Sequence, residues 1–190
     1  MHGQFEIILA GAGGQGLILA GTVLGEAAVH AGLNASCAQS YDVASRGGAS
    51  RAEVVVSAGD IAFPMVRRPD AVLALTQAAY DAQCPRLSPG GVALIDSGAV
   101  RGGAGKWREV ALPMIEEAHR RQSPGNTNLV ALGALVALTT VIPHQALEDV
   151  ISERFSGHSA AAAALGALRA GRDLAAAAAG AAAAAGGARA

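Results

Sequence analysis

The chain has 190 residues, 52% of them apolar, with 14 basic against 15 acidic side chains and only 3% aromatic residues. This composition excludes a chain that is disordered over most of its length, and it excludes a generally basic nucleic-acid-binding protein. The length suits one domain with a sizeable hydrophobic core.

The two cysteines, Cys37 and Cys84, are far apart and neither has a C-x-x-C partner. An iron–sulfur cluster needs four thiolates or a close equivalent, so these two residues cannot hold one. The sequence shows no secretory signal and no apolar stretch of membrane-spanning length. We therefore expect a cytoplasmic protein without membrane association, in which both thiols are free and buried.

A glycine-rich turn at residues 11–16, GAGGQG, follows a first apolar strand predicted at residues 5–10. The apolar periodicity of residues 17–31 predicts a helix, which gives the turn the strand–turn–helix context of phosphate-binding loops. Free N–H groups at the start of such a helix bind a phosphate or a carboxylate. Close packing of the helix on the sheet would use the same glycines without any ligand, so both interpretations stay open.

A second strand is predicted at residues 33–40, and it ends in Gln39 and Ser40. A dinucleotide site usually has an acidic residue at this point to bind the ribose, and that acid is absent. A polar loop then places Arg46 beside two glycines, at the strand end where open α/β sheets bind ligands. Arg46 could hold a phosphate with its planar fork, or it could form a salt bridge across a subunit contact.

The rest of the chain alternates apolar strands with helices, which predicts an α/β fold with a mostly parallel, Rossmann-like sheet. Two parts are expected: a domain at residues 1–156, and an alanine-rich C-terminal helix and low-complexity tail at residues 157–190. Residues 61–66 contain a proline and are an edge strand or a connector. Further strands are predicted at residues 51–57, 71–76, 92–96 and 106–112, and helices at 77–84, 113–121, 127–141, 143–155 and 160–179.

The side chains that could perform catalysis have structural alternatives. The five histidines are scattered without matching carboxylates or cysteines, so no metal site is expected. Asp96 ends a predicted strand and is catalytic or, more commonly, a cap or loop anchor. Asn126 and Asn128 could bind a ligand, although Asn126 also stands where a helix N-cap belongs. The residues thus indicate a ligand-binding loop and no catalytic residues.

Several segments together resemble the gamma subunit of 2-oxoacid:ferredoxin oxidoreductases, in the same order over residues 5–155. The resemblance is closer to enzymes acting on 2-oxoglutarate or on branched or aromatic 2-oxo acids than to the pyruvate enzymes, which more often have arginine at the position of Ala12. The segments are GAGGQG with LILAGTVLGEAA, then QSYDVASRGGASRAEVVVS, IAFPMVRRPDAVLAL and NLVALGALVAL.

The resemblance implies a three-layer α/β/α domain in a heteromeric complex that oxidatively decarboxylates a 2-oxo acid, forms acyl-coenzyme A and CO2, and reduces ferredoxin or another electron acceptor. Thiamine diphosphate, Mg and [4Fe-4S] clusters would belong to the alpha, beta and ferredoxin-like partner subunits, and this chain would lie on the coenzyme A side. By position, two loops would face cofactor or the active-site interface: Gly11, Gly13, Gly14, Gln15 and Gly16, then Ser45, Arg46, Gly47 and Gly48.

The chain departs from the family at Asp42 and Val43, where glycine usually follows the tyrosine, and in its alanine-rich C-terminal region. The apolar helix at residues 127–141 is hydrophobic on nearly every face, and we expect a partner chain to cover part of it. The alternative to the complex subunit is a free-standing nucleotide- or flavin-binding α/β protein that uses the same glycine loop.

Overall fold

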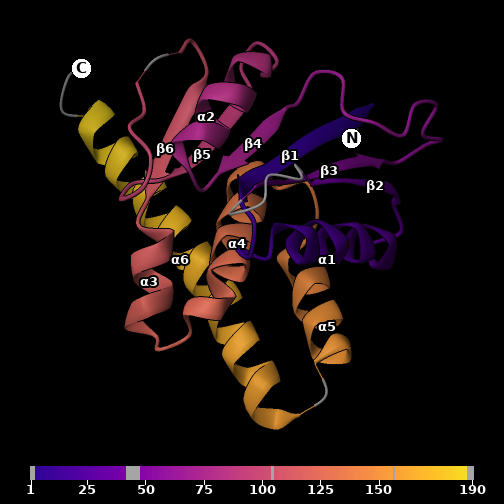
Figure 1. Cartoon of the computed structure of the whole chain (residues 1–190), viewed down its shortest axis with the longest axis vertical. Helices are drawn as coiled ribbons and strands as arrows, with labels where there is room; N and C mark the ends of the chain where they lie inside the picture. The colour runs from indigo at the N-terminus through magenta and orange to yellow at the C-terminus, as the bar shows by residue number, and fades with distance from the viewer. Residues whose placement is uncertain (1–2, 42–47, 104, 156, 188–190) are drawn as a thin grey trace.

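The computed structural model describes residues 3–41, 48–103, 105–155 and 157–187. A six-stranded sheet runs through this part of the chain in the order β2-β3-β1-β4-β5-β6 (Figure 1). The strands are β1 (Gln4–Ala12), β2 (Asn34–Tyr41), β3 (Ala49–Ser57), β4 (Ala71–Ala74), β5 (Val92–Asp96) and β6 (Arg108–Leu112).

One strand of the sheet, β3, runs against the others. The pairs β1–β4, β4–β5 and β5–β6 are parallel, whereas β3 is antiparallel to both β1 and β2. The connection from β2 to β3 spans residues 42–48, which is too short for the crossover that a parallel pair requires. The predicted, mostly parallel sheet is therefore confirmed, with one reversed strand that apolar patterning does not reveal.

Helices cover both faces of the sheet, as a three-layer fold requires (Figure 1). One face packs against α1, α4 and their neighbours in a large core that includes Ile7, Leu9 and Val54. The other face carries a thinner layer, with α2 over Ile8 and Val72. The α-helices are α1 (Leu17–His30), α2 (Gln77–Gln83), α3 (Met114–Arg120), α4 (Thr127–Thr139), α5 (His144–Arg154) and α6 (His158–Gly187), with short 3-10 turns at Cys84–Arg86 and Pro124–Asn126.

The apolar helix α4 is buried within this chain, so the expectation that a partner must cover it is wrong. Every residue from Thr127 to Val136 is buried. The alanine-rich α6 crosses α4 closely: a Cβ on Gly133 would strike the Leu168 carbonyl, and one on Gly171 would strike the Val130 carbonyl. Glycines on both helices let their backbones approach closely, and α6 completes the core with small side chains and with the fully buried Leu168.

The segment between β3 and β4 is an extended connector and contains no strand in the structure. Glu6 on β1 fixes its end, because the Glu6 Oε2 atom accepts hydrogen bonds from the backbone N–H groups of Arg67 at 2.7 Å and Arg68 at 2.8 Å. Among the helices of the described residues, none has the length and apolarity needed to span a membrane.

Candidate functional site

The glycine turn after β1 adopts a conformation that only glycine accepts readily at two positions. Gly14 has φ +86° and Gly16 has φ +72°, both in the left-handed region. Gly16 is the N-cap of α1 and provides no capping side chain. The turn therefore brings the start of a 14-residue helix to the carboxyl end of the sheet with its first N–H groups uncapped by a side chain.

Gln15 braces the turn from inside. Its Oε1 atom accepts a hydrogen bond from the backbone N–H of Ala12 at 2.7 Å. A Cβ on Gly11 would collide with this same oxygen, so the glycine at position 11 makes room for the amide. The structure thus gives Gly11 and Gln15 a role in shaping the loop, which is separate from their predicted role as ligand-facing residues.

Asn128, at the start of α4, supports the other end of the turn. Its Nδ2 atom donates a hydrogen bond to the Gly16 carbonyl oxygen at 3.0 Å, and the residue is only 2% exposed. A Cβ on Gly16 would lie 2.7 Å from that Nδ2 atom. The Oδ1 atom is buried and accepts no hydrogen bond from the described residues. Asn128 therefore positions the loop. In the sequence, the feature that distinguishes Asn128 is its place at the start of the apolar helix.

The second predicted loop meets the first at Gly48. The backbone N–H of Gly13 donates to the Gly48 carbonyl oxygen at 2.8 Å, and a Cβ on Gly13 would approach that oxygen to 3.2 Å. Ser45, Arg46 and Gly47 lie outside the described residues. The two glycine-bearing segments, more than 30 positions apart in the sequence, therefore touch at the carboxyl edge of the sheet.

A cavity of about 490 Å³ opens beside these loops. The helix after β1 covers one face of the sheet and the helix after β4 covers the other. The crevice between the ends of such strands is where open α/β sheets bind ligands. The cavity is lined by Ala10, Gly11, Ala12, Ser40, Ala49, Ser50, Arg51, Thr76, Ala78, Ala79, Ala82 and Gln83.

Arg51 is the single basic side chain among these lining residues, and sequence reasoning did not single it out. Its Nε atom lies 3.2 Å from Glu53 Oε1, while Glu53 itself is 6% exposed and lies deeper on β3. Its place at the start of a predicted strand made it look like an ordinary strand residue. In the β1–β3 register Arg51 pairs with Ala10, near the carboxyl end of β1, and both residues line the cavity.

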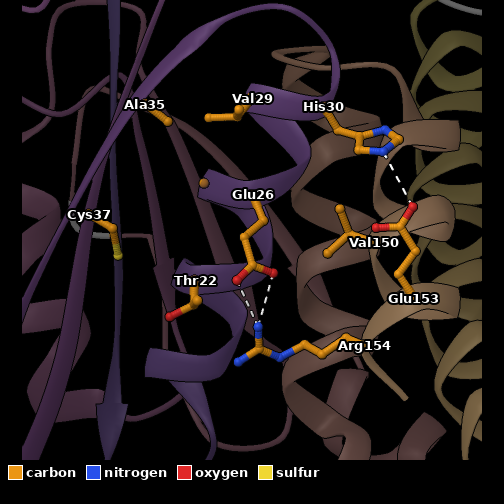
Figure 2. A pocket seen from close by; sticks show the side chains of 10 residues that line it. Thr22, Glu26, Val29, His30, Ala35, Cys37, Val150, Glu153 and Arg154 are labelled. Atoms are coloured by element: carbon orange, nitrogen blue, oxygen red, sulfur yellow. Dashed lines mark hydrogen bonds and ion pairs between the residues drawn. The ribbon is translucent and has the colours of Figure 1, made fainter. Parts of the chain in front are cut away.

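A larger groove of about 750 Å³ lies elsewhere, between α1, β2 and α5 (Figure 2). Its charged groups are already paired: Arg154 Nη1 lies 2.7 Å from Glu26 Oε1, and His30 Nε2 lies 3.5 Å from Glu153 Oε1. Cys37 on its wall is an exposed residue, so the expectation that both thiols are buried is wrong for this one. Partial desolvation raises the pKa of its thiol, which disfavours the reactive thiolate. None of the predicted loop residues lines this groove, so size alone does not make it the functional site.

Asp96 anchors a loop, which was the structural interpretation of this residue. Its Oδ1 atom accepts from the backbone N–H groups of Gly98 and Ala99, each at 3.0 Å, and its Oδ2 atom accepts from that of Ile115 at 2.8 Å.

Burial, with Glu109 and Asp81 nearby, raises the pKa of the Cys84 thiol to about 12. Within the described ranges no cluster of three metal-binding side chains occurs.

Comparison with known proteins decides the family. Residues 6–174 match the family described as pyruvate ferredoxin/flavodoxin oxidoreductase. The chain belongs to the gamma subunits of 2-oxoacid:ferredoxin oxidoreductases. It is 40% identical over 153 residues to the 2-oxoglutarate synthase subunit KorC of Methanocaldococcus jannaschii, covering 77% of this chain and 81% of that protein.

Two solved structures share the fold of this gamma subunit. The keto/oxoacid ferredoxin oxidoreductase gamma subunit of Geobacter sulfurreducens is 39% identical with a TM-score of 0.84, covering 93% of this chain and 98% of that one. The 2-oxoglutarate:ferredoxin oxidoreductase of Magnetococcus marinus, solved with 2-oxoglutarate, coenzyme A and succinyl-CoA bound, is 26% identical with a TM-score of 0.83. The match covers 93% of this chain and 32% of that longer one.

Proposed function

We propose that this gamma subunit lies on the coenzyme A side of a thiamine diphosphate-dependent complex that converts 2-oxoglutarate to succinyl-coenzyme A and CO2. Thiamine diphosphate, Mg and the [4Fe-4S] clusters that carry electrons to ferredoxin would reside in partner subunits, because Cys37 and Cys84 supply too few thiolates for a cluster. The choice of 2-oxoglutarate among 2-oxo acids follows the names of the relatives with which this chain shares 40% and 26% identity.

The observation that carries this proposal is the contact between the two loops at Gly13 and Gly48, at the start of α1. Uncapped N–H groups at a helix start favour an anion, and the left-handed Gly14 has no atom within 4 Å of its missing Cβ. An open backbone surface of this kind suits the pyrophosphate or the pantetheine amides of coenzyme A. The loop residues Gly11, Gly13, Gly14, Gln15 and Gly16 would form one wall of that site.

The role of this chain would be to bind coenzyme A and to position it for the reaction. Its candidate acid, Asp96, is saturated by three backbone N–H groups, and its thiols are disfavoured as thiolates. A coenzyme held against the glycine loop would have its thiol oriented toward a partner subunit, where thiamine diphosphate would supply the decarboxylation chemistry. Holding two reactants in a reactive orientation is by itself a large contribution to rate.

The substitution Gly13→Val tests this role in the assembled complex. A branched side chain would press on the Gly48 carbonyl and occupy the space in front of the loop. We expect the apparent KM for coenzyme A to rise by about tenfold or more, which corresponds to ~1.4 kcal/mol of lost binding, with the KM for 2-oxoglutarate unchanged. Steady-state kinetics with each substrate varied in turn measures both.

Gly59→Val is the matched control, because no atom lies within 4 Å of the missing Cβ of Gly59 and its φ is not left-handed. It follows β3, at the end of that strand remote from the loop contact at Gly48. Wild-type kinetics from Gly59→Val are expected. Unchanged coenzyme A kinetics from a folded, assembled Gly13→Val complex would remove the loop from the coenzyme site.

A further inference from the structure

The cavity beside the glycine loop has the composition of an anion-binding site. Its polar lining consists of hydroxyls, one amide and one guanidinium, contributed by Ser40, Ser50, Thr76, Gln83 and Arg51, and its lining residues include no acid. The volume of about 490 Å³ lies in the range of small-molecule sites. A cavity with one cation and hydroxyl donors stabilises a negatively charged group.

Arg51 forms an ion pair with Glu53 and makes no hydrogen bond through its buried Nε atom within the described residues. Glu53 approaches its Nε atom at 3.2 Å, and Glu53 Oε2 is also bound by the backbone N–H of Val66 at 3.2 Å. The Nε atom is buried and makes no hydrogen bond within the described residues, and the Arg51 side chain is 34% exposed. The guanidinium is therefore paired with Glu53 by charge alone, and its N–H donors can bind an oxyanion.

The acid lies deeper in the sheet than the base. Arg51 pairs with Ala10 in the β1–β3 register and Glu53 pairs with Ile8, two residues further from the carboxyl end of β1. Glu53 is absent from the cavity lining, where Arg51 is present. A bound anion would therefore meet the cation first, while the carboxylate orients it from the far side.

We propose that Arg51 is a phosphate-binding residue, which holds a phosphate of the nucleotide part of coenzyme A in this cavity. This inference rests on the proposed function for the identity of the ligand. The neighbouring Thr76 hydroxyl, whose oxygen accepts from Ala79 N–H at 3.3 Å, keeps its own hydrogen for a phosphate oxygen. Glycine loop and Arg51 would then bind one ligand from two sides, because Gly11 and Ala12 line both the turn and the cavity.

The test compares Arg51→Ala, Arg51→Lys and the control Arg108→Ala in the assembled complex. Arg108 is an exposed arginine that begins β6, at the opposite end of the sheet. For Arg51→Ala we expect the apparent KM for coenzyme A to rise about 10- to 100-fold, as befits a charge-assisted hydrogen-bond pair. Arg51→Lys should recover only part of the loss, because an ammonium lacks the planar fork, and Arg108→Ala should behave as wild type.

Two further measurements separate this inference from the proposed function. Calorimetric titration of the full chain with ADP should show binding that Arg51→Ala abolishes; that result supports the phosphate site even where no coenzyme A-dependent activity is found. A complex with coenzyme A-dependent activity whose Arg51→Ala variant keeps a wild-type KM for coenzyme A would overturn the inference and leave the function standing. A rise confined to the KM for 2-oxoglutarate would make Arg51 a carboxylate-binding residue and also overturn it.

Discussion

Single residues around the glycine turn show how one backbone conformation depends on a distant side chain. Gly16 combines a left-handed φ of +72° with contact to the Asn128 amide, which lies 112 positions away in the sequence. The glycine pattern itself was readable from the sequence, because strand, turn and helix follow one another locally. The Asn128 contact was not, because it depends on how α4 packs against α1.

The substitution Gly16→Ala is expected to destabilise the fold by about 2–5 kcal/mol, since left-handed strain costs ~1–2 kcal/mol and overpacking against Asn128 adds ~1–3 kcal/mol. Gly32→Ala isolates the first contribution, because Gly32 has φ +77° and open space around its missing Cβ. Urea unfolding of both variants measures the difference. In an Asn128→Ala background the excess cost of Gly16→Ala should shrink; an undiminished excess would contradict the contact.

Two residues of the site illustrate the limits of sequence reasoning at this scale. Gln15 is predicted to face a ligand from its place in the loop, and the structure adds a contact that spacing does not reveal: its Oε1 atom accepts a hydrogen bond from Ala12 N–H at 2.7 Å. Arg51 looked like part of an ordinary strand, yet it lines a cavity that β1 and α2 complete. In both cases the deciding fact is the direction of a side chain, which spacing and residue type do not determine.

Among the elements, α6 differs most from what its composition indicated. Alanine richness correctly predicted a helix, but the pairing of Gly171 with α4 and of Gly133 with α6 appears only in the packed structure. The strand β3 is similar: its residues were predicted as a strand, while its antiparallel direction follows from the short β2–β3 connection. Local composition identifies an element well, and its partner and direction depend on the rest of the chain.

The crossing of α4 and α6 gives a prediction at this scale. Gly171→Ala should destabilise the protein by about 1–3 kcal/mol, because the added Cβ would strike the Val130 carbonyl on α4. Gly166→Ala on the same helix meets no atom within 4 Å. It should stabilise by up to ~1 kcal/mol through helix propensity. Thermal unfolding of the pair checks this, and equal melting temperatures would refute the close crossing.

A polar contact fastens the same helix to α5. Glu148 accepts hydrogen bonds from Arg169 Nε at 3.1 Å and Nη2 at 2.5 Å, and Arg172 Nη1 lies 3.8 Å from it. The hydrogen bond from Arg169 lowers the pKa of the Glu148 carboxyl below its usual range. The helical C-terminal region is thus joined to the body of the protein by packing on α4 and by ion pairing to α5.

At the scale of the whole molecule, we propose a subunit that binds coenzyme A and positions it. Its core is complete without a partner on α4, and its loops gather on one edge of the sheet. Among the described residues, Asp96 is a loop anchor and no cluster of three metal-binding side chains occurs. The two cysteines are too few for an iron–sulfur cluster, and our proposal that partner subunits hold the clusters stays a prediction.

The most direct test of this account is purification of the tagged chain from its own cells under native conditions, followed by an assay for coenzyme A-dependent oxidation of 2-oxoglutarate with ferredoxin as acceptor. The account predicts co-elution with larger partner chains that carry thiamine diphosphate and iron–sulfur clusters, and an activity that stops when coenzyme A is omitted. A protein that elutes alone, with a bound nucleotide or flavin and no such activity, would contradict it.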